Sequence, residues 1–371
     1  MSWFAADARD YALVTLLAVV ASYVFVRALE SGPRRRRWLI GYGVALLALG
    51  LANLFALLII PAHALTLASR IRCNPGIRRG LLSGWLLAVA AALVVVSPVA
   101  VTGYQQMHQV SWITRLTVRD VLSVMRVAGS RPLFGVMAGI IIVAVIAGAI
   151  INRAWVREHW PEPLVALTLP WLVLPPAVLL AGSVAHPIYT YRYIAFCIPA
   201  LALLMGATLA ALGRVAGAAG LIAVLLVGLP LQISERGSHG HGFNIREIDQ
   251  IVAHHEHRGD AVFNITADHY ERGLEIAYPY GLRRLRDVTM GASPVASGTM
   301  GGTYASAAVT VLRLATVHRV WAVGGVVKHV PLLEGLGFRL VRHWYVTGVY
   351  IRLYVKEHAA STVHSTARAG Q

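Results

Sequence analysis

Long apolar stretches separated by short polar loops make up most of the first 231 residues. A helix that crosses a bilayer needs about 20 mainly apolar residues, and eight segments reach or approach that length. The pattern predicts a polytopic α-helical membrane protein with about eight transmembrane helices. The predicted segments are Tyr11–Leu29, Trp38–Leu51, Leu54–Ser69, Leu81–Val101, Leu133–Ile151, Leu164–Ala181, Ile194–Leu212 and Gly217–Leu231.

The second and third segments are short, and only Ala52 and Asn53 separate them. Two interpretations are open. The pair can form a tight helical hairpin, or it can form one long helix that is interrupted at Pro61, because proline lacks a backbone N–H and disrupts a helix interior.

Arginines cluster in alternate loops between these segments. Cytoplasmic loops of membrane proteins carry an excess of Lys and Arg, so the clusters predict which loops face the cytoplasm. With eight helices in the plasma membrane, all the clustered loops fall on that side, and the N-terminus and the region after Ser234 fall on the extracytoplasmic side. The arginines are Arg34, Arg35, Arg36, Arg37, Arg70, Arg72, Arg78, Arg79, Arg153, Arg157 and Arg214.

The loop from Thr102 to Arg131 is also basic, although it falls on the extracytoplasmic side. Arg115, Arg119 and Arg126 share one face of a helical projection, and apolar residues recur at helical spacing on another. This pattern predicts an amphipathic helix on the membrane surface, with Arg115 and Arg119 contacting lipid headgroups. The apolar positions are Ile113, Leu116, Val121, Val124, Met125 and Ala128.

The apolar runs after residue 233 are too short to span a membrane. Residues 1–233 are therefore expected to form the transmembrane bundle, 234–243 a linker, 244–357 a small extracytoplasmic α/β domain, and 358–371 a disordered tail. The expected elements of the α/β domain are helices at Asn244–His257 and Tyr304–Thr316, strands at Ala261–Ile265 and Arg319–Val323, and a hairpin of Phe338–Trp344 and Val349–Val355.

Composition agrees with a membrane protein. Hydrophobic residues are 57% of the 371 residues and charged residues 13%, whereas soluble domains carry about 25% charged residues. A net charge of +16 can indicate a nucleic-acid partner. Arginines in cytoplasmic loops account for the charge, so no nucleic acid is expected as a partner. Cys73 and Cys197 are the two cysteines, and they predict neither a disulfide nor a thiolate metal site.

The segment His186-Pro-Ile-Tyr-Thr-Tyr-Arg192-Tyr193 places polar and aromatic residues between two strongly apolar segments. An arginine at the centre of a membrane helix costs about 2.5–3.5 kcal/mol on insertion scales, which makes Arg192 a candidate for function. Its guanidinium can hold a phosphate bidentately. The alternative is an interfacial role, in which Arg192 extends to water and His186 and the tyrosines anchor the helix ends.

The polar residues Asp7, Arg9 and Asp10 precede the first apolar segment. They can be anchors at the membrane interface, or an acidic and basic group at the mouth of an external cavity that orients a sugar hydroxyl or a phosphate.

Three motifs carry a family resemblance. Ala6-Asp7-Ala-Arg9-Asp10-Tyr11-Ala-Leu resembles the Gln-Glu-Ala-Arg-Pro-Tyr-Ala-Leu signature of bacterial GT-C glycosyltransferases, in the protein-mannosyltransferase-like group of actinobacteria. The run from Pro187 through Arg192-Tyr193 to Pro199-Ala-Leu-Ala-Leu resembles a later helix of that group, and Gln109-Val-Ser-Trp112-Ile resembles its external loop. The C-terminal domain is similar to its extracytoplasmic tail. Asp7 replaces the usual Glu, and Asp10 the usual Pro.

The resemblance implies a membrane glycosyltransferase that moves a sugar, mannose in this group, from a polyprenyl-phosphate donor to a lipoglycan, polysaccharide or protein acceptor. It implies that Arg192 binds the donor phosphate with help from Tyr193 and His186. Asp7 and Asp10 are the candidate catalytic acids, and the residues expected to shape the substrate site are Arg9, Tyr11 and Tyr189. Membrane lipids are further expected partners.

The family's usual catalytic acid lies in a first external loop, after a first helix, and the chain begins almost at the motif that follows this loop. We therefore expect a form that lacks this helix and loop. Two alternatives to an active transferase remain open: a transporter or flippase for a lipid-linked glycan, which would use the same arginine to hold a phosphate, and a non-catalytic membrane protein.

A metal site is a weaker hypothesis. His254-His-Glu-His257, together with His239 and His241, could bind a metal, but their spacing fixes no coordination geometry, so a solvated helix end is the favoured interpretation. No metal ligand is assigned. The patterns require no cofactor, and a divalent cation is left open.

Overall fold

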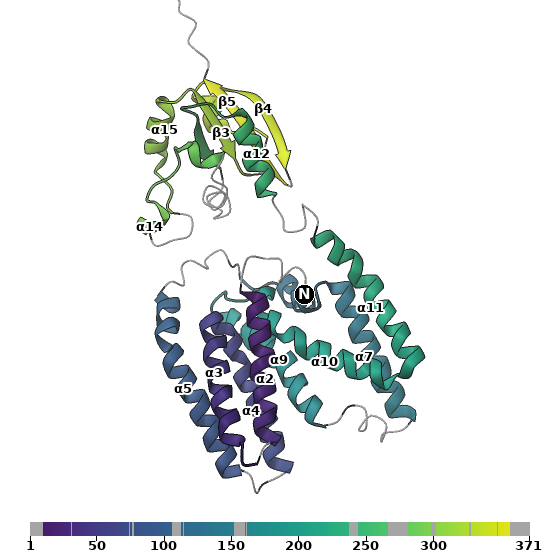
Figure 1. Ribbon diagram of the computed structural model, residues 1–371. Coiled ribbons are helices and arrows are strands. Elements are labelled where there is room, and N and C mark those ends of the chain that lie inside the picture. Colours follow the sequence, from purple (N-terminus) through teal and green to yellow (C-terminus); the bar gives the residue numbers. More distant parts are fainter. Residues whose placement is uncertain are drawn as a thin grey trace, which may run out of the picture. The chain divides into compact units, whose positions relative to one another are not determined.

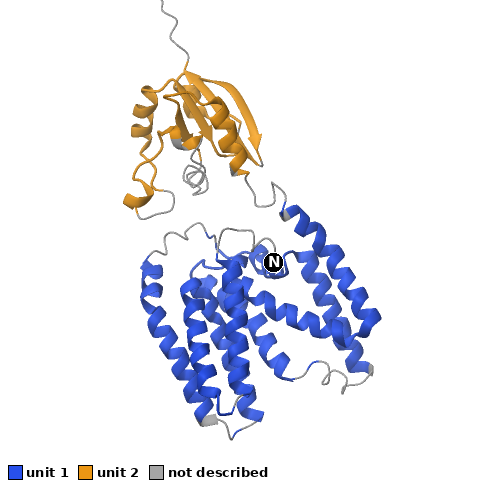
Figure 2. Cartoon of the chain, in the orientation of Figure 1, with its two compact units in different colours: residues 1–237 blue, residues 238–371 orange. Residues whose placement is uncertain are grey.

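The structure is a computed structural model. It describes residues 10–30, 32–73, 75, 78–105, 113, 115–151, 160, 162–236, 244–265, 281–297, 302–325, 328–346 and 348–356. The chain divides into two compact units, residues 1–237 and residues 238–371 (Figure 2). The expected linker of residues 234–243 begins inside a helix that continues to Glu235, and residues 237–243 and the expected disordered tail lie outside the described residues.

Unit 1 is helical throughout its described part (Figure 1). Its elements are α2 Tyr11–Glu30, α3 Arg35–Ala52, the 3-10 helix η1 Leu54–Leu58, α4 Ile59–Cys73, α5 Arg78–Gln105, α6 Val118–Ser123, η4 Val124–Ala128, α7 Arg131–Ile151, α9 Glu162–Ala185, η5 Tyr191–Cys197, α10 Ile198–Ala211 and α11 Gly213–Glu235.

Seven helical segments in the described part of the chain are long and apolar enough to cross a membrane. They are Tyr11–Glu30, Leu54–Cys73, Gly80–Gln105, Arg131–Ile150, Glu162–Ala185, Tyr191–Ala211 and Gly213–Ser234. The eighth predicted segment corresponds to α3, a helix of 18 residues. Its first turn holds Arg35, Arg36 and Arg37, so its composition is less apolar than that of the other seven.

A reversal at Asn53 separates α3 from η1 and α4. Asn53 is extended, with φ −158° and ψ 115°, and its side-chain Oδ1 accepts a hydrogen bond from the Phe55 N–H at 3.0 Å. The Tyr42 hydroxyl of α3 bonds His63 Nδ1 of α4 at 3.0 Å, and these residues lie at nearly equal distances along the chain from the reversal. The pair is therefore a helical hairpin. The alternative break at Pro61 is wrong, because Pro61 lies inside α4, where a proline in the first turn loses no helical hydrogen bond.

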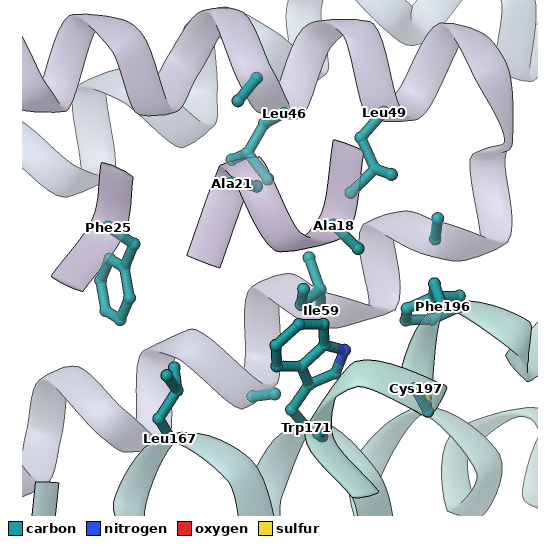
Figure 3. Packing of buried hydrophobic residues seen from close by; sticks show 14 of the residues in the cluster. Ala18, Ala21, Phe25, Leu46, Leu49, Ile59, Leu167, Trp171, Phe196 and Cys197 are labelled. Atoms are coloured by element: carbon teal, nitrogen blue, oxygen red, sulfur yellow. The ribbon is translucent and has the colours of Figure 1, made fainter. Parts of the chain in front are cut away.

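Small residues let the helices of unit 1 approach closely. Figure 3 shows Leu46 and Leu49 of α3 directed at Ala18 and Ala21 of α2. All four side chains are fully buried.

Helix α5 runs parallel to α3. A Cβ atom on Gly43 would lie 3.3 Å from the Ala88 carbonyl oxygen, and one on Gly50 would lie 3.0 Å from a Val96 methyl carbon. The contacts keep nearly the same spacing along both helices, so the two axes point the same way, with α4 as the return crossing between them.

The predicted surface helix between Thr102 and Arg131 is not continuous. Within the described residues between Gln105 and Arg131, the six-residue α6 is followed directly by η4, which ends at Gly129, whose φ of 105° favours glycine. Ser123 and Val127 are buried, whereas Val121 and Met125, which were predicted on the apolar face, are exposed. Leu116, Val124 and Ala128 instead pack partly buried against the core of unit 1, and contact of this segment with the membrane surface stays a prediction.

Unit 2 is a small α/β domain, as predicted. Its elements are α12 Ile245–His255, β1 Ala261–Asn264, η6 Leu282–Arg284, β2 Arg286–Asp287, α14 Pro294–Ser297, α15 Ala307–Ala315, β3 Arg319–Val323, α16 Pro331–Gly335, β4 Phe338–Val346 and β5 Val349–Lys356. The strand order is β2-β1-β3-β5-β4. Strands β2, β1 and β3 are parallel, and the predicted hairpin β4–β5 adds two antiparallel strands.

Alternation along the strands gives the sheet two buried faces. Val262 and Val323 pack with Ile248 and Val252 of α12. The neighbouring strand residues contribute to a second cluster with Leu314 of α15. Helices therefore cover both faces, as the near-continuous apolar strands require.

Candidate functional site

Among the described residues, most of those singled out in the sequence lie at the end of unit 1 where α2 begins and α9 ends. The 3-10 helix η5 lies there, in contact with α2, α9, η1 and η4. Thr190, which precedes it, is extended, with φ −137° and ψ 144°, so the chain crosses this end of the bundle before it enters α10. Pro199 is well placed in the first turn of α10, where its missing N–H has no helical partner.

Two arginines from distant segments contact the same aromatic ring. The Arg126 guanidinium carbon lies 5.2 Å from the centroid of the Tyr191 ring, and that of Arg192 lies 5.9 Å from the same centroid. These distances suit cation–π contacts. Arg126 comes from η4 and Arg192 from η5, so the fold concentrates two positive charges around Tyr191. Such a pair has the chemistry to hold a phosphate.

Buried contacts fix the segment that carries Arg192. Tyr189 is buried, and its hydroxyl lies 3.1 Å from Ser123 Oγ. Because Ser123 Oγ donates its own hydrogen to the Asp120 carbonyl oxygen at 2.6 Å, the Tyr189 hydroxyl is the donor. Burial is the main cause that raises the pKa of Tyr189 above its ordinary value, so it stays protonated at neutral pH.

A second aromatic contact ties η5 to the helical hairpin. The rings of Tyr193 and Phe55 are stacked, with centroids 4.6 Å apart. Phe55 is itself held by the Asn53 side chain. Tyr189 and Tyr193, before and after Arg192, are thus positioned by separate elements, which leaves little freedom for the backbone between them.

The charge at this end is predominantly positive. Arg115 and Arg119 are exposed, and Arg131 donates to the Arg119 carbonyl oxygen at 3.3 Å. Asp120 caps α6 by accepting hydrogen bonds from Thr117, at 2.8 Å from N and 2.6 Å from Oγ1. Its carboxylate is therefore engaged in the local turn.

The remaining predicted residues fall in different places. Asp7 and Arg9 lie outside the described residues. Asp10 is half-buried in the turn before α2, and its carbonyl oxygen accepts the Val14 N–H at 2.8 Å. Tyr11 is buried in the same apolar cluster as Tyr189, so both rings contribute to the packing of this end of unit 1. His186 is exposed just after α9.

The sequence did not single out Arg126 as a partner of Arg192. It was expected on the basic face of a surface helix. Only the tertiary contact between η4 and η5 brings it to Tyr191, and no local pattern encodes a contact between residues 65 positions apart. The basic character of the loop was the one available signal.

Within the described residues, no group of three or more His, Cys, Asp or Glu side chains is arranged to hold a metal ion. In unit 2, His254 and His255 place their Nδ1 atoms 2.7 and 2.9 Å from helix carbonyl oxygens. His239 and His241 lie outside the described residues.

No protein-family model, curated protein or solved structure matches the chain. The grounds for a function are therefore the sequence motifs and the geometry of this end of unit 1.

Proposed function

We propose that unit 1 is embedded in the plasma membrane, with α3 crossing beside the seven apolar helices and the Tyr191 end facing outward. Large apolar side chains on its outer surface support this proposal: Leu87 is 71% exposed, Leu226 70% and Ile150 79%. Extended exposed apolar surface is unusual on a soluble protein and suits contact with lipid. The arginine-rich loops at the opposite end give the orientation, which makes unit 2 extracytoplasmic.

At the outward end we propose transfer of a sugar, mannose by the family resemblance, from a polyprenyl-phosphate donor to a lipoglycan, polysaccharide or protein. The observation that carries this proposal is the convergence of Arg126 and Arg192 on Tyr191. A lipid-linked phosphate needs fixed cationic donors at the membrane surface, and two arginines on rigid segments supply them. Exposed apolar residues of α6 nearby, Val118 and Leu122, suit contact with the isoprenoid chain.

In the proposed reaction, an acceptor hydroxyl oxygen forms a bond to the anomeric carbon of the sugar, and the bond from that carbon to the phosphate oxygen breaks. The bonding electrons leave with polyprenyl phosphate, whose added negative charge Arg126 and Arg192 stabilise. A carboxylate takes the proton of the hydroxyl. Asp10 and Asp7 are the candidates for this base: Asp10 lies in the turn before α2 at the same end, and Asp7 precedes it by three residues in the sequence. Arg9 is proposed to orient the sugar, and Arg115 and Arg119 to contact headgroups.

The test compares arginine variants of the full chain in membranes supplied with radiolabelled polyprenyl-phosphate mannose. Arg192→Gln and Arg126→Gln should each lower the transfer of label to lipid, polysaccharide or protein fractions by roughly 100-fold, because each removes a fixed donor to the leaving group. Arg236→Gln is the matched control. This arginine is exposed at the end of α11, and its loss should leave transfer unchanged.

Transfer that survives both substitutions would overturn the phosphate role. Absence of transfer by the unaltered chain would overturn the transferase itself. If the unaltered chain bound the donor without transferring it, and Arg192→Gln abolished that binding, the result would favour a transporter or flippase for a lipid-linked glycan.

A further inference from the structure

A groove runs along the outside of the seam between α3 and α5, at the end of unit 1 opposite Tyr191. Its volume is about 690 Å³, and Figure 1 shows the two helices side by side. The walls are apolar and rich in small residues, and the lining includes Gly43, Val44, Gly84, Ala88, Ala91 and Val95.

Small residues create the groove. A Cβ atom on Gly84 would lie 2.6 Å from Leu39 Cδ1, so no larger side chain fits there without displacing Leu39. At Gly43 the helices approach to backbone contact with Ala88. The missing side chains at these two positions let α3 and α5 pack closely, and the small residues along the outside of the seam leave a shallow apolar channel there.

The mouth of the groove is cationic. Arg35 and Arg36 line it beside Gly32 and Pro33. The Nε–H group of Arg35 is shielded from solvent and has no hydrogen-bond partner among the described residues. A buried N–H of a charged group without a partner is costly, so this atom indicates a missing acceptor.

The acidic side chains described at this end are otherwise engaged. Glu30 pairs with Arg27 at 3.3 Å, and Glu162 accepts a hydrogen bond from Ser69 Oγ at 2.6 Å. The positive charge of Arg35 and Arg36 is therefore not neutralised by them.

We propose that this groove binds an anionic phospholipid, with its phosphate on Arg35 and Arg36 and one acyl chain along Gly43, Ala88 and Ala91. Such a lipid has an anionic headgroup attached to apolar acyl chains, so it is complementary to a groove with a cationic mouth and apolar walls. Arginine matches a phosphate with two parallel donors. This site is distinct from the Tyr191 end, and it depends on membrane insertion but not on sugar transfer.

Native mass spectrometry of the full chain in mild detergent tests the site with phosphatidylglycerol and phosphatidylcholine of identical acyl chains. The unaltered chain should retain phosphatidylglycerol roughly tenfold better. The double variant Arg35→Gln/Arg36→Gln should bind both lipids equally. Arg37→Gln is the matched control and should keep the preference, because Arg37 is exposed and does not line the groove.

A second pair of variants tests the channel. Ala91→Trp should abolish retention of both lipids by filling it, whereas Ala90→Trp, on an exposed position outside the lining, should not. Thermal unfolding of each variant verifies that it is folded. No headgroup preference in the unaltered chain, an equal loss with Arg37→Gln, or displacement of the lipid by inorganic phosphate would overturn the proposal.

Discussion

At the scale of single residues, His63 shows how unit 1 accommodates a polar group in its core. It is fully buried, and its Nε2 lies 3.1 Å from Ser22 Oγ. Ser22 donates its own hydrogen to the Ala18 carbonyl oxygen at 2.8 Å, so His63 Nε2 carries the proton and Nδ1 accepts from the Tyr42 hydroxyl. Both nitrogens of the neutral ring thus have hydrogen-bond partners, Ser22 on α2 and Tyr42 on α3. The ring also stacks on Phe25, with centroids 4.5 Å apart.

Replacing His63 by leucine should lower the free energy of unfolding of unit 1 by about 1–2 kcal/mol, because two interhelical hydrogen bonds are lost. Thermal unfolding of the detergent-solubilised chain measures the change. His186→Leu is the control, since His186 is exposed. Equal effects of the two substitutions would contradict a role for the buried network.

Tyr354 gives unit 2 a dependence on alkaline pH. Burial is the main cause that raises the pKa of Tyr354 above its ordinary value; its hydroxyl accepts the Val330 N–H at 2.9 Å. Because the folded state holds this proton more tightly than the unfolded state, its contribution is fully present below about pH 10 and is lost as pH rises further.

The unfolding free energy of unit 2 in the full chain should therefore fall above about pH 10, and Tyr354→Phe should reduce the slope. Urea titrations followed by tryptophan fluorescence measure it. Tyr345→Phe serves for comparison, because Tyr345 is 62% exposed. An unchanged slope in the Tyr354 variant would remove this residue as the cause.

At the scale of elements, apolar periodicity predicted most helices and strands but not how they turn. The hairpin at Asn53 depends on the Asn53 side chain, which accepts a hydrogen bond from the next turn. The apolar pattern of the sequence does not distinguish this hairpin from a continuous helix. The short strand β2 and the break between α6 and η4 were missed, because two-residue pairing and 3-10 geometry leave no periodic signal.

Asp260 joins the loop between α12 and β1 to strand β3. Its carboxylate, buried at the start of β1, accepts hydrogen bonds from the His257 N–H at 3.0 Å, Arg319 Nε at 3.0 Å and Trp321 Nε1 at 2.9 Å. Asp260→Ala should destabilise unit 2 by about 3 kcal/mol, because it leaves buried donors unpaired. Hydrogen exchange of the full chain should then quicken across β3.

The comparison for this prediction is Gln250→Ala, an exposed position on α12, which should leave exchange in β3 unchanged. Protection of β3 that is the same in the Asp260 variant and in the unaltered chain would show that the carboxylate is not needed there.

At the scale of the whole molecule, two cysteines can report the proposed orientation. Cys73 is exposed at the arginine-rich end, and Cys197 is fully buried at the other. A membrane-impermeant maleimide should therefore label Cys73 from the cytoplasmic side only, and Cys73→Ser should remove the labelling. Labelling of intact cells from outside would reverse the orientation.

The candidate site was predictable only in part at this scale. Arg192, Tyr189 and Tyr193 stood out because polar and aromatic residues interrupt an apolar pattern. Arg126 and Phe55 reach the same place through folding, from segments far apart in the chain, and only the packing of η5 on η1 and η4 brings them together.

The parallel course of α3 and α5 has a consequence for biosynthesis. The face of α3 that contacts Ala88 and Val96 has no partner until α4 has been made and α5 follows it. During translation, α3 must therefore wait until α4 has reversed the chain direction before its contact with α5 can form. Until then α3 packs against α2, whose alanines cover its other face. The two faces of α3 are therefore covered in the order in which α2 and α5 are synthesised.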